Sequence, residues 1–395
     1  MDHVLECSGY DFVKANIVRG QGCYLFDDHD NKFIDFEAGV WCTSLGHNHP
    51  LINQAIKRQI DDIAHLGFRY TNDIVEETAV KVLDTVGLPD GKCVFLSSGS
   101  EAVELGVQIA RCLSSRPLFL TLSNSYLSAY GDSGKRNSDG WFCFDWVKCN
   151  DCITSKCTPQ CLCLKEIPIA NIGGLILEPG NTSGLVKLPP KKLVQALEAL
   201  IKQQNGIIMV DEVTTGLGRT GNWYGFQHYS LQPDIIAIGK GLGNGYPVSA
   251  VIMTDNIALR LEKTDFHYAQ SHQNDALGCA VAKEVITVMQ TEELVKRSKL
   301  VGDKFLNALK LLAQRYSSIK DVRGRGLMLA VEFNSKDKES PLPLVFEKLL
   351  EKGFLVGYIP VANLIRFYPA LTIKEADIEK MLKVFEQVLG EISKY

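Results

Sequence analysis

The chain has 395 residues, of which 46% are hydrophobic, and a net charge of −4. A chain of this length can bury a large core and exceeds the usual size of one domain, so two domains are expected. The small net charge gives no electrostatic basis for binding nucleic acid or an anionic membrane. No segment has the length of a membrane span and the first residues lack the pattern of a signal peptide. We therefore expect a cytoplasmic protein whose partners are small molecules and other copies of itself.

Apolar strands alternate with amphipathic helices through the middle of the chain. This alternation is typical of a largely parallel sheet with helices on both faces. In chain order, we expect a strand at 94–96, a helix at 101–112, a strand at 174–177, a helix at 189–201 and strands at 207–210, 235–238 and 248–253. A long helical stretch from 275 toward 316 then leads to a smaller α+β unit. That unit has elements at 326–333, 344–351, 354–356 and 364–367.

These elements predict three parts of the chain. Residues 51–290 form a large cofactor-binding domain, and residues 291–395 form a small α+β domain. Residues 1–50 are an N-terminal segment that packs with the small domain.

Lys240 lies in a glycine-rich turn that follows the apolar run 235–238. That run has the length and β-branched composition of a buried strand, so the lysine should leave the sheet at its carboxyl end with a partly desolvated amine. Desolvation lowers the pKa of an amine and makes it a nucleophile toward a carbonyl. Asp211 repeats this arrangement with a carboxylate, because it directly follows the apolar run 207–210.

An amine and a carboxylate would then face one crevice from the ends of two strands. Pyridoxal phosphate requires such a pair. The lysine forms a Schiff base, and the aspartate keeps the pyridine nitrogen protonated so that the ring can accept electrons. We therefore predict pyridoxal 5'-phosphate as the cofactor, with Lys240 and Asp211 as catalytic residues.

Two longer motifs contain these residues, DEVTTGLGRTG at 211–221 and QPDIIAIGKGLG at 232–243. Both resemble class III aminotransferases, which are fold-type I enzymes of the aspartate aminotransferase superfamily. Further matches occur in the expected order at 34–41, 45–50, 97–104, 177–179 and 364–371, so the resemblance spans almost the whole chain.

The resemblance implies an α/β fold with a large domain, whose mainly parallel sheet is flanked by helices, and a smaller α+β domain. It also implies an aminotransferase of the EC 2.6.1 type. Such an enzyme moves an amino group from an amino acid to a 2-oxo acid, pyruvate or 2-oxoglutarate, through a Schiff base on Lys240. The implied assembly is a homodimer with active sites at the subunit interface.

Several residues are expected to hold the cofactor. Ser98, Gly99 and Ser100 stand at a predicted helix N-terminus, where unpaired amides and the helix dipole favour a phosphate. The resemblance implies the remaining contacts. It places Ser271 on the phosphate of the neighbouring subunit, and it places on the ring Tyr126 and Val213 by stacking, Thr214 at the hydroxyl and Glu178 as a second acid.

Substrate contacts are also implied by the resemblance. Arg366 matches an arginine that pairs with a substrate carboxylate, and Trp41 and Arg69 match further pocket positions, Arg69 acting from the neighbouring chain. Ala129 stands where ornithine-type enzymes have an arginine, and Ser183 lies near their gating glutamate. A donor of the ornithine or acetylornithine type is therefore disfavoured. We expect an amino acid with one essential carboxylate.

A segment from Cys143 to Cys163 does not follow from the resemblance and holds six cysteines. Cys149 and Cys152 have the spacing of metal ligands, and Cys157 and Cys161 are further candidates, although the other intervals fit no standard zinc ribbon. An iron–sulfur cluster is also possible. The alternative is a reduced cysteine-rich loop near the site entrance, with no metal.

Other reactions use the same scaffold, because the machinery for removing a proton is shared. A racemase or epimerase, an aminomutase or a decarboxylase is the main alternative. A dinucleotide fingerprint at 216–221 is rejected, because no clean helix follows it. A non-catalytic protein with a vestigial site is a third class, and the presence of Lys240, Asp211 and Arg366 together argues against it.

Overall fold

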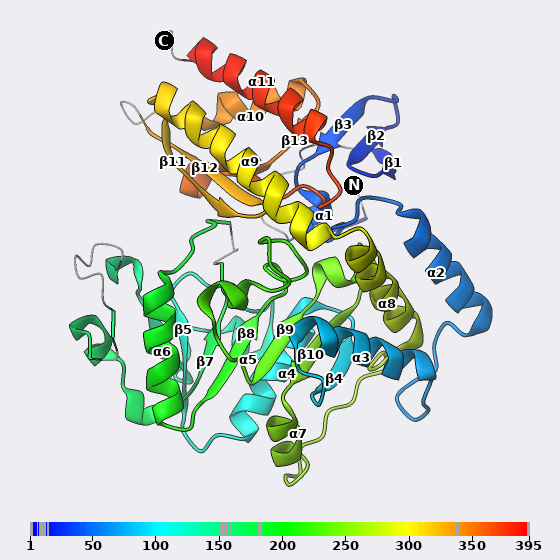
Figure 1. Cartoon of the computed structure of the whole chain (residues 1–395), viewed down its shortest axis with the longest axis vertical. Coiled ribbons are helices and arrows are strands. Elements are labelled where there is room, and N and C mark those ends of the chain that lie inside the picture. Colours follow the sequence, from blue (N-terminus) through cyan, green and yellow to red (C-terminus); the bar gives the residue numbers. More distant parts are fainter. Residues whose placement is uncertain are drawn as a thin grey trace.

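The computed structural model describes residues 3–5, 7, 13, 16–149, 157–158, 160–180, 184–335 and 340–392. In this part of the chain a seven-stranded sheet occupies the lower half of the view in Figure 1. Two four-stranded sheets and the C-terminal helices lie in the upper half, together with the first strands of the chain.

The large sheet has the strand order β4-β10-β9-β8-β7-β5-β6. The strands β5, β6, β7, β8 and β9 pair in parallel, and β10 runs antiparallel to both of its neighbours. The bounds are β4 (Lys92–Leu96), β5 (Leu118–Leu122), β6 (Trp141–Phe144), β7 (Ile172–Leu177), β8 (Ile207–Asp211), β9 (Ile235–Ile238) and β10 (Ser249–Met253). This sheet confirms the predicted α/β class with a mainly parallel sheet.

Both faces of this sheet are buried, which explains why its strands are apolar runs and not alternating ones. In β8, Ile207 and Met209 pack with α4 (Gly99–Cys112) on one face. Ile208 and Val210 belong to the core on the other face. That second core includes residues of the helices α3 (Asp73–Val86), α6 (Lys191–Gln203) and α8 (Ala276–Thr291).

The N-terminal strands share a sheet with the C-terminal part. β3 pairs in parallel with β13, so the order is β1-β2-β3-β13. The third sheet has the order β11-β12-β15-β14. The bounds are β1 (Ile17–Gln21), β2 (Tyr24–Asp27), β3 (Lys32–Asp35), β11 (Ile319–Arg325), β12 (Met328–Phe333), β13 (Phe354–Leu355), β14 (Gly357–Ile359) and β15 (Leu364–Phe367). The domain boundaries stay predictions.

The remaining helices complete the layers. They are α1 (Ala38–Trp41), α2 (Pro50–Asp62), α5 (Gly131–Gly134), α7 (Asp255–Leu261), α9 (Leu294–Arg315), α10 (Leu342–Glu351) and α11 (Glu375–Ile392). No helix in the described ranges is both long and apolar enough to cross a membrane.

Two helices have different bounds in the structure from those predicted from the sequence. The stretch expected from 275 to 316 is two helices, α8 and α9, because Glu293 adopts a left-handed conformation with φ of 49° between them. The helix expected from 189 begins at Lys191, since Pro190 is its N-cap. Apart from these ends, the expected elements of the middle of the chain are present.

Gly302 provides a test of the packing between α9 and the β11–β12 hairpin. A Cβ at Gly302 would lie 2.1 Å from the carbonyl oxygen of Gly326, whereas one at Gly390 in α11 would meet only Tyr316 Oη, at 3.6 Å. Gly302→Ala should therefore lower the free energy of unfolding by about 1–3 kcal/mol, because backbone must move apart. Gly390→Ala should raise it by up to about 1 kcal/mol through helix propensity. Urea unfolding of both variants measures this, and equal stability of the two would contradict the packing described.

Candidate active site

Three ionisable residues meet at the carboxyl edge of the large sheet. Asp211 ends β8, Glu178 directly follows β7, and Lys240 lies two residues after β9. These strands are parallel neighbours, so their carboxyl ends open into the same crevice. The structure therefore brings together the predicted amine and both predicted acids.

The Lys240 amine is held in a largely enclosed position. Its Nζ donates a hydrogen bond to Thr214 Oγ1 at 2.7 Å and lies 4.8 Å from the ring centre of Trp41. Burial lowers the pKa of the amine, and the negative charge of Asp211 opposes part of this effect. A lowered pKa leaves more of the amine neutral at physiological pH, which is the form that attacks a carbonyl.

Asp211 and Glu178 are buried beside each other, with 4% and 3% of their surfaces exposed. Burial, and then the charge of Glu178, raise the pKa of Asp211. The Val213 amide opposes this by donating to Asp211 Oδ1 at 3.0 Å. Glu178 accepts a hydrogen bond from the amide of Tyr126 at 3.0 Å. Two adjacent buried acids form an environment that favours a cationic group.

The start of α4 confirms the predicted helix N-terminus. Ser98 Oγ accepts from the amide of Glu101 at 3.2 Å, and Glu101 Oε2 accepts from the amide of Ser98 at 2.8 Å, so the two residues form a capping box. The amides of Gly99 and Ser100 come next, at first-turn positions that have no acceptor inside the helix. Ser100 Oγ accepts from the amide of Ala129 at 3.1 Å.

The α4 start packs tightly on the other parts of the site. A Cβ at Gly99 would lie 2.5 Å from a methyl group of Val213. A Cβ at Gly239, the residue before Lys240, would lie 3.2 Å from the Gly99 Cα. A side chain at Gly99 would therefore force the start of α4 and the turn after β8 apart, and one at Gly239 would crowd the α4 start against the residue before the lysine. Tyr126 lies at the edge of this group and is 47% exposed.

Arg366 reaches the site from β15 and is 7% exposed. Its Nη2 contacts Glu37 Oε2 at 3.3 Å, while its Nε is buried and has no partner in the described part of the chain. Burial raises the pKa of Glu37 to about 7, although Arg366 opposes this rise. The guanidinium is thus only partly neutralised, and it keeps donor capacity for another carboxylate.

Trp41 covers the gap between Lys240 and Arg366. The Arg366 guanidinium carbon lies 4.7 Å from its ring centre, and the ring of Tyr368 lies 5.1 Å away. Trp41 ends a left-handed turn, since Ala38, Gly39 and Val40 also have positive φ between 45° and 56°. Such a conformation costs about 1–2 kcal/mol per non-glycine residue, so the position of this ring is held by the surrounding structure.

Asp35 holds that turn. Its Oδ1 accepts from the amide of Glu37 at 2.8 Å, and its Oδ2 accepts from the amide of Gly39 at 3.1 Å and contacts His47 Nε2 at 2.8 Å. Asp35, Glu37 and Tyr368 were not predicted as site residues. Their positions inside the motifs 34–41 and 364–371 are the signal that could have drawn attention to them.

Two residues predicted to act on a neighbouring subunit, Arg69 and Ser271, are exposed on this chain. Their expected contacts belong to a neighbouring subunit and stay predictions. Ser183 lies outside the described residues, as does Cys152.

The cysteine segment is described only in part. Cys149, Cys157, Cys161 and Cys163 are partly buried and pack against the main core. Burial and the neighbouring thiols, Cys163 first, raise the pKa of Cys149 to about 12. Among the described residues, the groups of three or more potential ligand atoms within 4.8 Å of one another contain histidine and aspartate and no cysteine. A metal at this segment stays a prediction.

Comparison with known proteins gives the family. Residues 7–128 and 147–389 match the family model of class-III aminotransferases. The acetylornithine aminotransferases of Methanocaldococcus jannaschii and Aquifex aeolicus are each 30% identical. The alignments cover 98% and 97% of this chain, and 96% and 99% of those proteins.

Solved structures agree. An S-selective transaminase from Arthrobacter superposes with a TM-score of 0.89 at 25% identity and covers 100% of this chain and 97% of its own. The acetylornithine aminotransferase of Elizabethkingia anophelis gives 0.84 at 26% identity, covering 98% and 96%. The chain therefore belongs to the class III aminotransferases, with the fold-type I architecture. It is a pyridoxal-phosphate-dependent aminotransferase whose substrates are amino and oxo acids, and the racemase, aminomutase and decarboxylase alternatives are not favoured.

The residues of the site fit this cofactor. The Gly99 and Ser100 amides at the start of α4 suit a phosphate. The buried pair of Asp211 and Glu178 suits a protonated ring nitrogen. Lys240 supplies the amine at the same crevice.

The raised pKa of Glu37 predicts a pH dependence of stability. A carboxyl whose pKa rises on folding, here from 4.5 to about 7, binds its proton more tightly in the folded state. Its contribution is therefore full below pH 4.5 and is lost as pH rises through 7, by up to about 3 kcal/mol. Denaturation midpoints measured from pH 5 to 8 should fall less for Glu37→Gln than for the wild type. The exposed control Glu379→Gln should follow the wild type. Parallel curves for all three proteins would contradict this account.

Proposed function

We propose that Lys240 carries the covalent link to the cofactor and moves the reacting proton. When bound, pyridoxal phosphate supplies an aldehyde that joins to amines and a ring that accepts an electron pair. The buried amine of Lys240, with its lowered pKa, is suited to accept a proton at Nζ from the α-carbon of the donor and to return it. The hydroxyl of Thr214, 2.7 Å away, orients this amine.

Asp211 holds the proton on the ring nitrogen in this proposal. A cation at that position reverses the effect of burial, because it stabilises the ionised carboxylate. Glu178 lies beside Asp211 and adds a second negative charge. Tyr126 and Val213 pack on the two ring faces, and Ser98, Gly99 and Ser100 bind the phosphate. What supports this assignment is the convergence of three strand ends on one crevice.

We propose that Arg366 binds the carboxylate of the amino donor and of the oxo acid. Within the described residues its buried Nε has no partner and its guanidinium contacts the Glu37 carboxylate at 3.3 Å, which leaves donor groups available beside the rings of Trp41 and Tyr368. The acceptor is pyruvate or 2-oxoglutarate.

Several relatives are named for acetylornithine. Ala129, however, stands where ornithine-type enzymes have an arginine, so it offers no charged side chain to the carboxylate of such a donor, and its amide is bonded to Ser100. We propose a donor with one essential carboxylate and not acetylornithine.

We propose that the enzyme acts as a homodimer. Ser271 then reaches the phosphate of the neighbouring subunit, and Arg69 its substrate. Both side chains are exposed on one chain alone. Phe68 and Tyr70, beside Arg69, are 56% and 72% exposed and are apolar groups that a second chain would cover.

Substitution of Lys240 tests the proton transfer. Lys240→Ala should abolish turnover with every donor, and added methylamine should restore a measurable part of it, because the small amine can occupy the space left by the side chain. Asp211→Asn should keep the cofactor and lower kcat about 100-fold or more, since an electrostatic contribution is lost. Steady-state rates together with cofactor content measure both effects. Wild-type rates in either variant would contradict the assignment.

Substitution of Arg366 tests the donor class. Arg366→Gln should raise KM for carboxylate donors such as L-alanine about 10- to 100-fold, the loss expected for charge-assisted hydrogen bonds. An amine without a carboxylate, 1-phenylethylamine, is the control and should be affected little. Glu37→Gln should lower KM for the carboxylate donors, because it releases the guanidinium. Equal losses with both kinds of donor would make Arg366 structural, and efficient turnover of acetylornithine by the wild type would contradict the proposed donor.

A further inference from the structure

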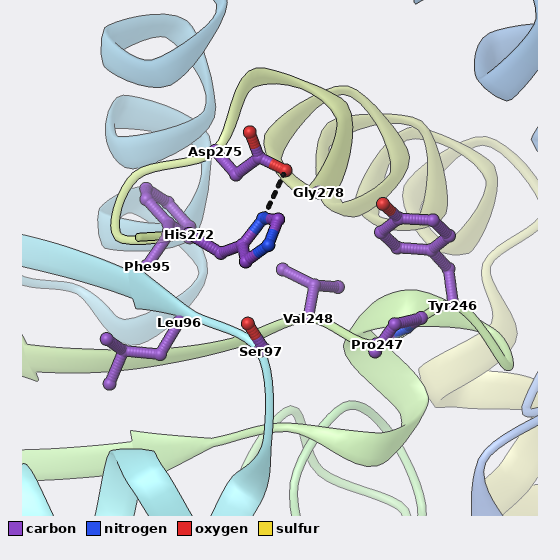
Figure 2. A pocket seen from close by; sticks show the side chains of 9 residues that line it. All are labelled: Phe95, Leu96, Ser97, Tyr246, Pro247, Val248, His272, Asp275 and Gly278. Atoms are coloured by element: carbon purple, nitrogen blue, oxygen red, sulfur yellow. Dashed lines mark ion pairs between the residues drawn. The ribbon is translucent and has the colours of Figure 1, made fainter. Parts of the chain in front are cut away.

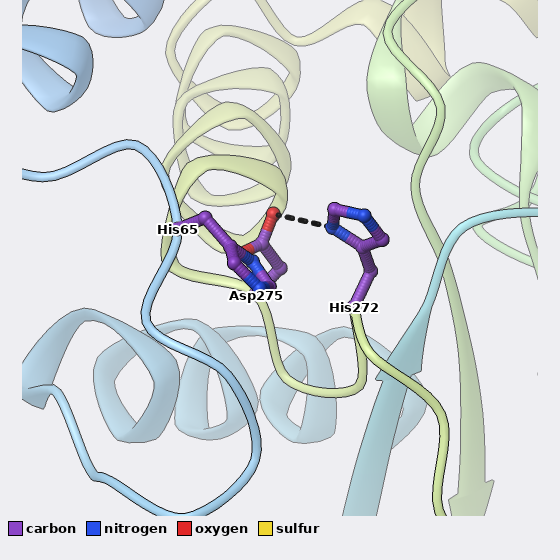
Figure 3. Close-up of side chains that lie close together, drawn as sticks. All are labelled: His65, His272 and Asp275. Atoms are coloured by element: carbon purple, nitrogen blue, oxygen red, sulfur yellow. Dashed lines mark hydrogen bonds and ion pairs between the residues drawn. The ribbon is translucent and has the colours of Figure 1, made fainter.

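Three side chains outside the active site converge on one point. His65 lies on the connection between α2 and α3, His272 lies in the turn before α8, and Asp275 is the N-cap of α8. His65 Nδ1 is 3.0 Å from Asp275 Oδ1, and His272 Nδ1 is 3.6 Å from Asp275 Oδ2. Figure 3 shows both rings beside the carboxylate, and their centres are 4.6 Å apart.

The carboxylate of Asp275 does not make the hydrogen bond that an aspartate at a helix N-cap normally makes. An N-cap aspartate usually accepts a hydrogen bond from the first turn of its helix, which is worth about 1 kcal/mol. Asp275 makes no such bond, whereas the N-cap residues Asn72 and Thr254 of α3 and α7 do. Its two oxygens instead face the two imidazole rings, although the side chain is only 13% exposed.

The distances suit a shared ion. The 3.6 Å between His272 Nδ1 and Asp275 Oδ2 is too long for a hydrogen bond. Zinc bonds to nitrogen and oxygen of about 2.0–2.2 Å place neighbouring ligand atoms in a tetrahedral shell about 3.3–3.6 Å apart. The ligand atoms of the three residues all lie within 4.8 Å of one another. The 3.0 Å contact of His65 with Oδ1, a hydrogen bond in the absence of an ion, and the 3.6 Å contact of His272 with Oδ2 lie close to the spacing of ligands around zinc.

The turn that carries two of these ligands is fixed to the sheet. The amide of Asn274 donates to the carbonyl of Phe95 in β4, and the amide of Phe95 donates to Asn274 Oδ1, each at 2.9 Å. The amide of His272 donates to Gln270 Oε1 at 2.7 Å. His272 and Asp275 are thus held before any ion arrives, which lowers the cost of binding.

A cavity of about 150 Å³ adjoins the cluster. Figure 2 shows His272 and Asp275 on its wall, with Tyr246 and Val248 across from them. Three protein ligands leave at least one coordination position of a zinc ion open. The cavity is large enough for water molecules at that position.

A second group of residues has potential ligand atoms within 4.8 Å of one another, but one of its carboxylates is already used in hydrogen bonds. It consists of Asp27, the last residue of β2, and Asp28 and His29 in the turn that follows. Asp27 already accepts three hydrogen bonds from His29 and Asn31, so its carboxylate shapes the turn. This group therefore serves as an internal control.

We propose that His65, His272 and Asp275 bind one zinc ion, which ties the connection after α2 to the start of α8. Imidazole and carboxylate are suitable ligands for this metal. On a single chain the two histidines are 44% and 57% exposed. The proposal is independent of the roles assigned to Lys240 and Arg366.

The test is the zinc content of the holoenzyme after equilibrium dialysis against buffered micromolar zinc. The wild type should hold one zinc ion per chain more than His65→Asn and Asp275→Asn, whatever the cysteines also bind. His29→Asn, which alters the other group, should match the wild type. The wild type should also gain in Tm on addition of zinc, and the two cluster variants should lose that gain.

Equal zinc content in all four proteins would overturn the proposal, as would a zinc-dependent Tm that ignores His65 and Asp275. A second measurement holds even where a variant fails to fold. Wild-type crystals grown with zinc should give an anomalous difference peak at the zinc edge between the three side chains, and absence of that peak at saturating zinc would overturn the site.

Discussion

The structure depends on the burial of three ionisable groups at one edge of a sheet. These groups, Lys240, Asp211 and Glu178, are shielded from water because their strands are parallel neighbours covered by helices on both faces. An isolated buried charge would be costly, and here Asp211 and Lys240 each oppose part of the effect of burial on the other. The pKa of the lysine is lowered by burial and that of Asp211 is raised by burial and Glu178. This arrangement suits a cofactor that has an aldehyde at one position and a cationic nitrogen at another.

The residues proposed to bind the substrate come from outside the seven-stranded sheet. Arg366 comes from β15 and Trp41 from a left-handed turn that Asp35 holds, so substrate recognition is built on a different layer from the chemistry. Arg219, in the turn after β8, connects the large sheet to this second layer. It is 2% exposed, and its Nη1 donates to the carbonyls of Leu327 at 3.0 Å and Pro369 at 2.5 Å. A shift between the layers would therefore disturb the turn that carries Val213 and Thr214.

Much of this arrangement could be predicted from the sequence. The fully apolar runs before Asp211 and Lys240 indicated buried parallel strands, and Ser98 with Glu101 indicated the start of α4. Other features have no local signature. The pair of Glu37 and Arg366 joins residues 329 positions apart, and the left-handed turn at Trp41 is maintained by contacts with Asp35 and not by its own residue types. The antiparallel direction of β10 and the meeting of His65 with Asp275 also depend on tertiary packing, which periodicity does not report.

The most direct test is to reduce the holoenzyme with borohydride, digest it, and locate the attached pyridoxyl group by mass spectrometry. The added mass is expected on the peptide that contains Lys240, and that labelling should be lost when an amino donor is added before reduction. Labelling of a different lysine, or none in enzyme that retains its cofactor, would contradict the assignment of the strand-end amine as the point of attachment.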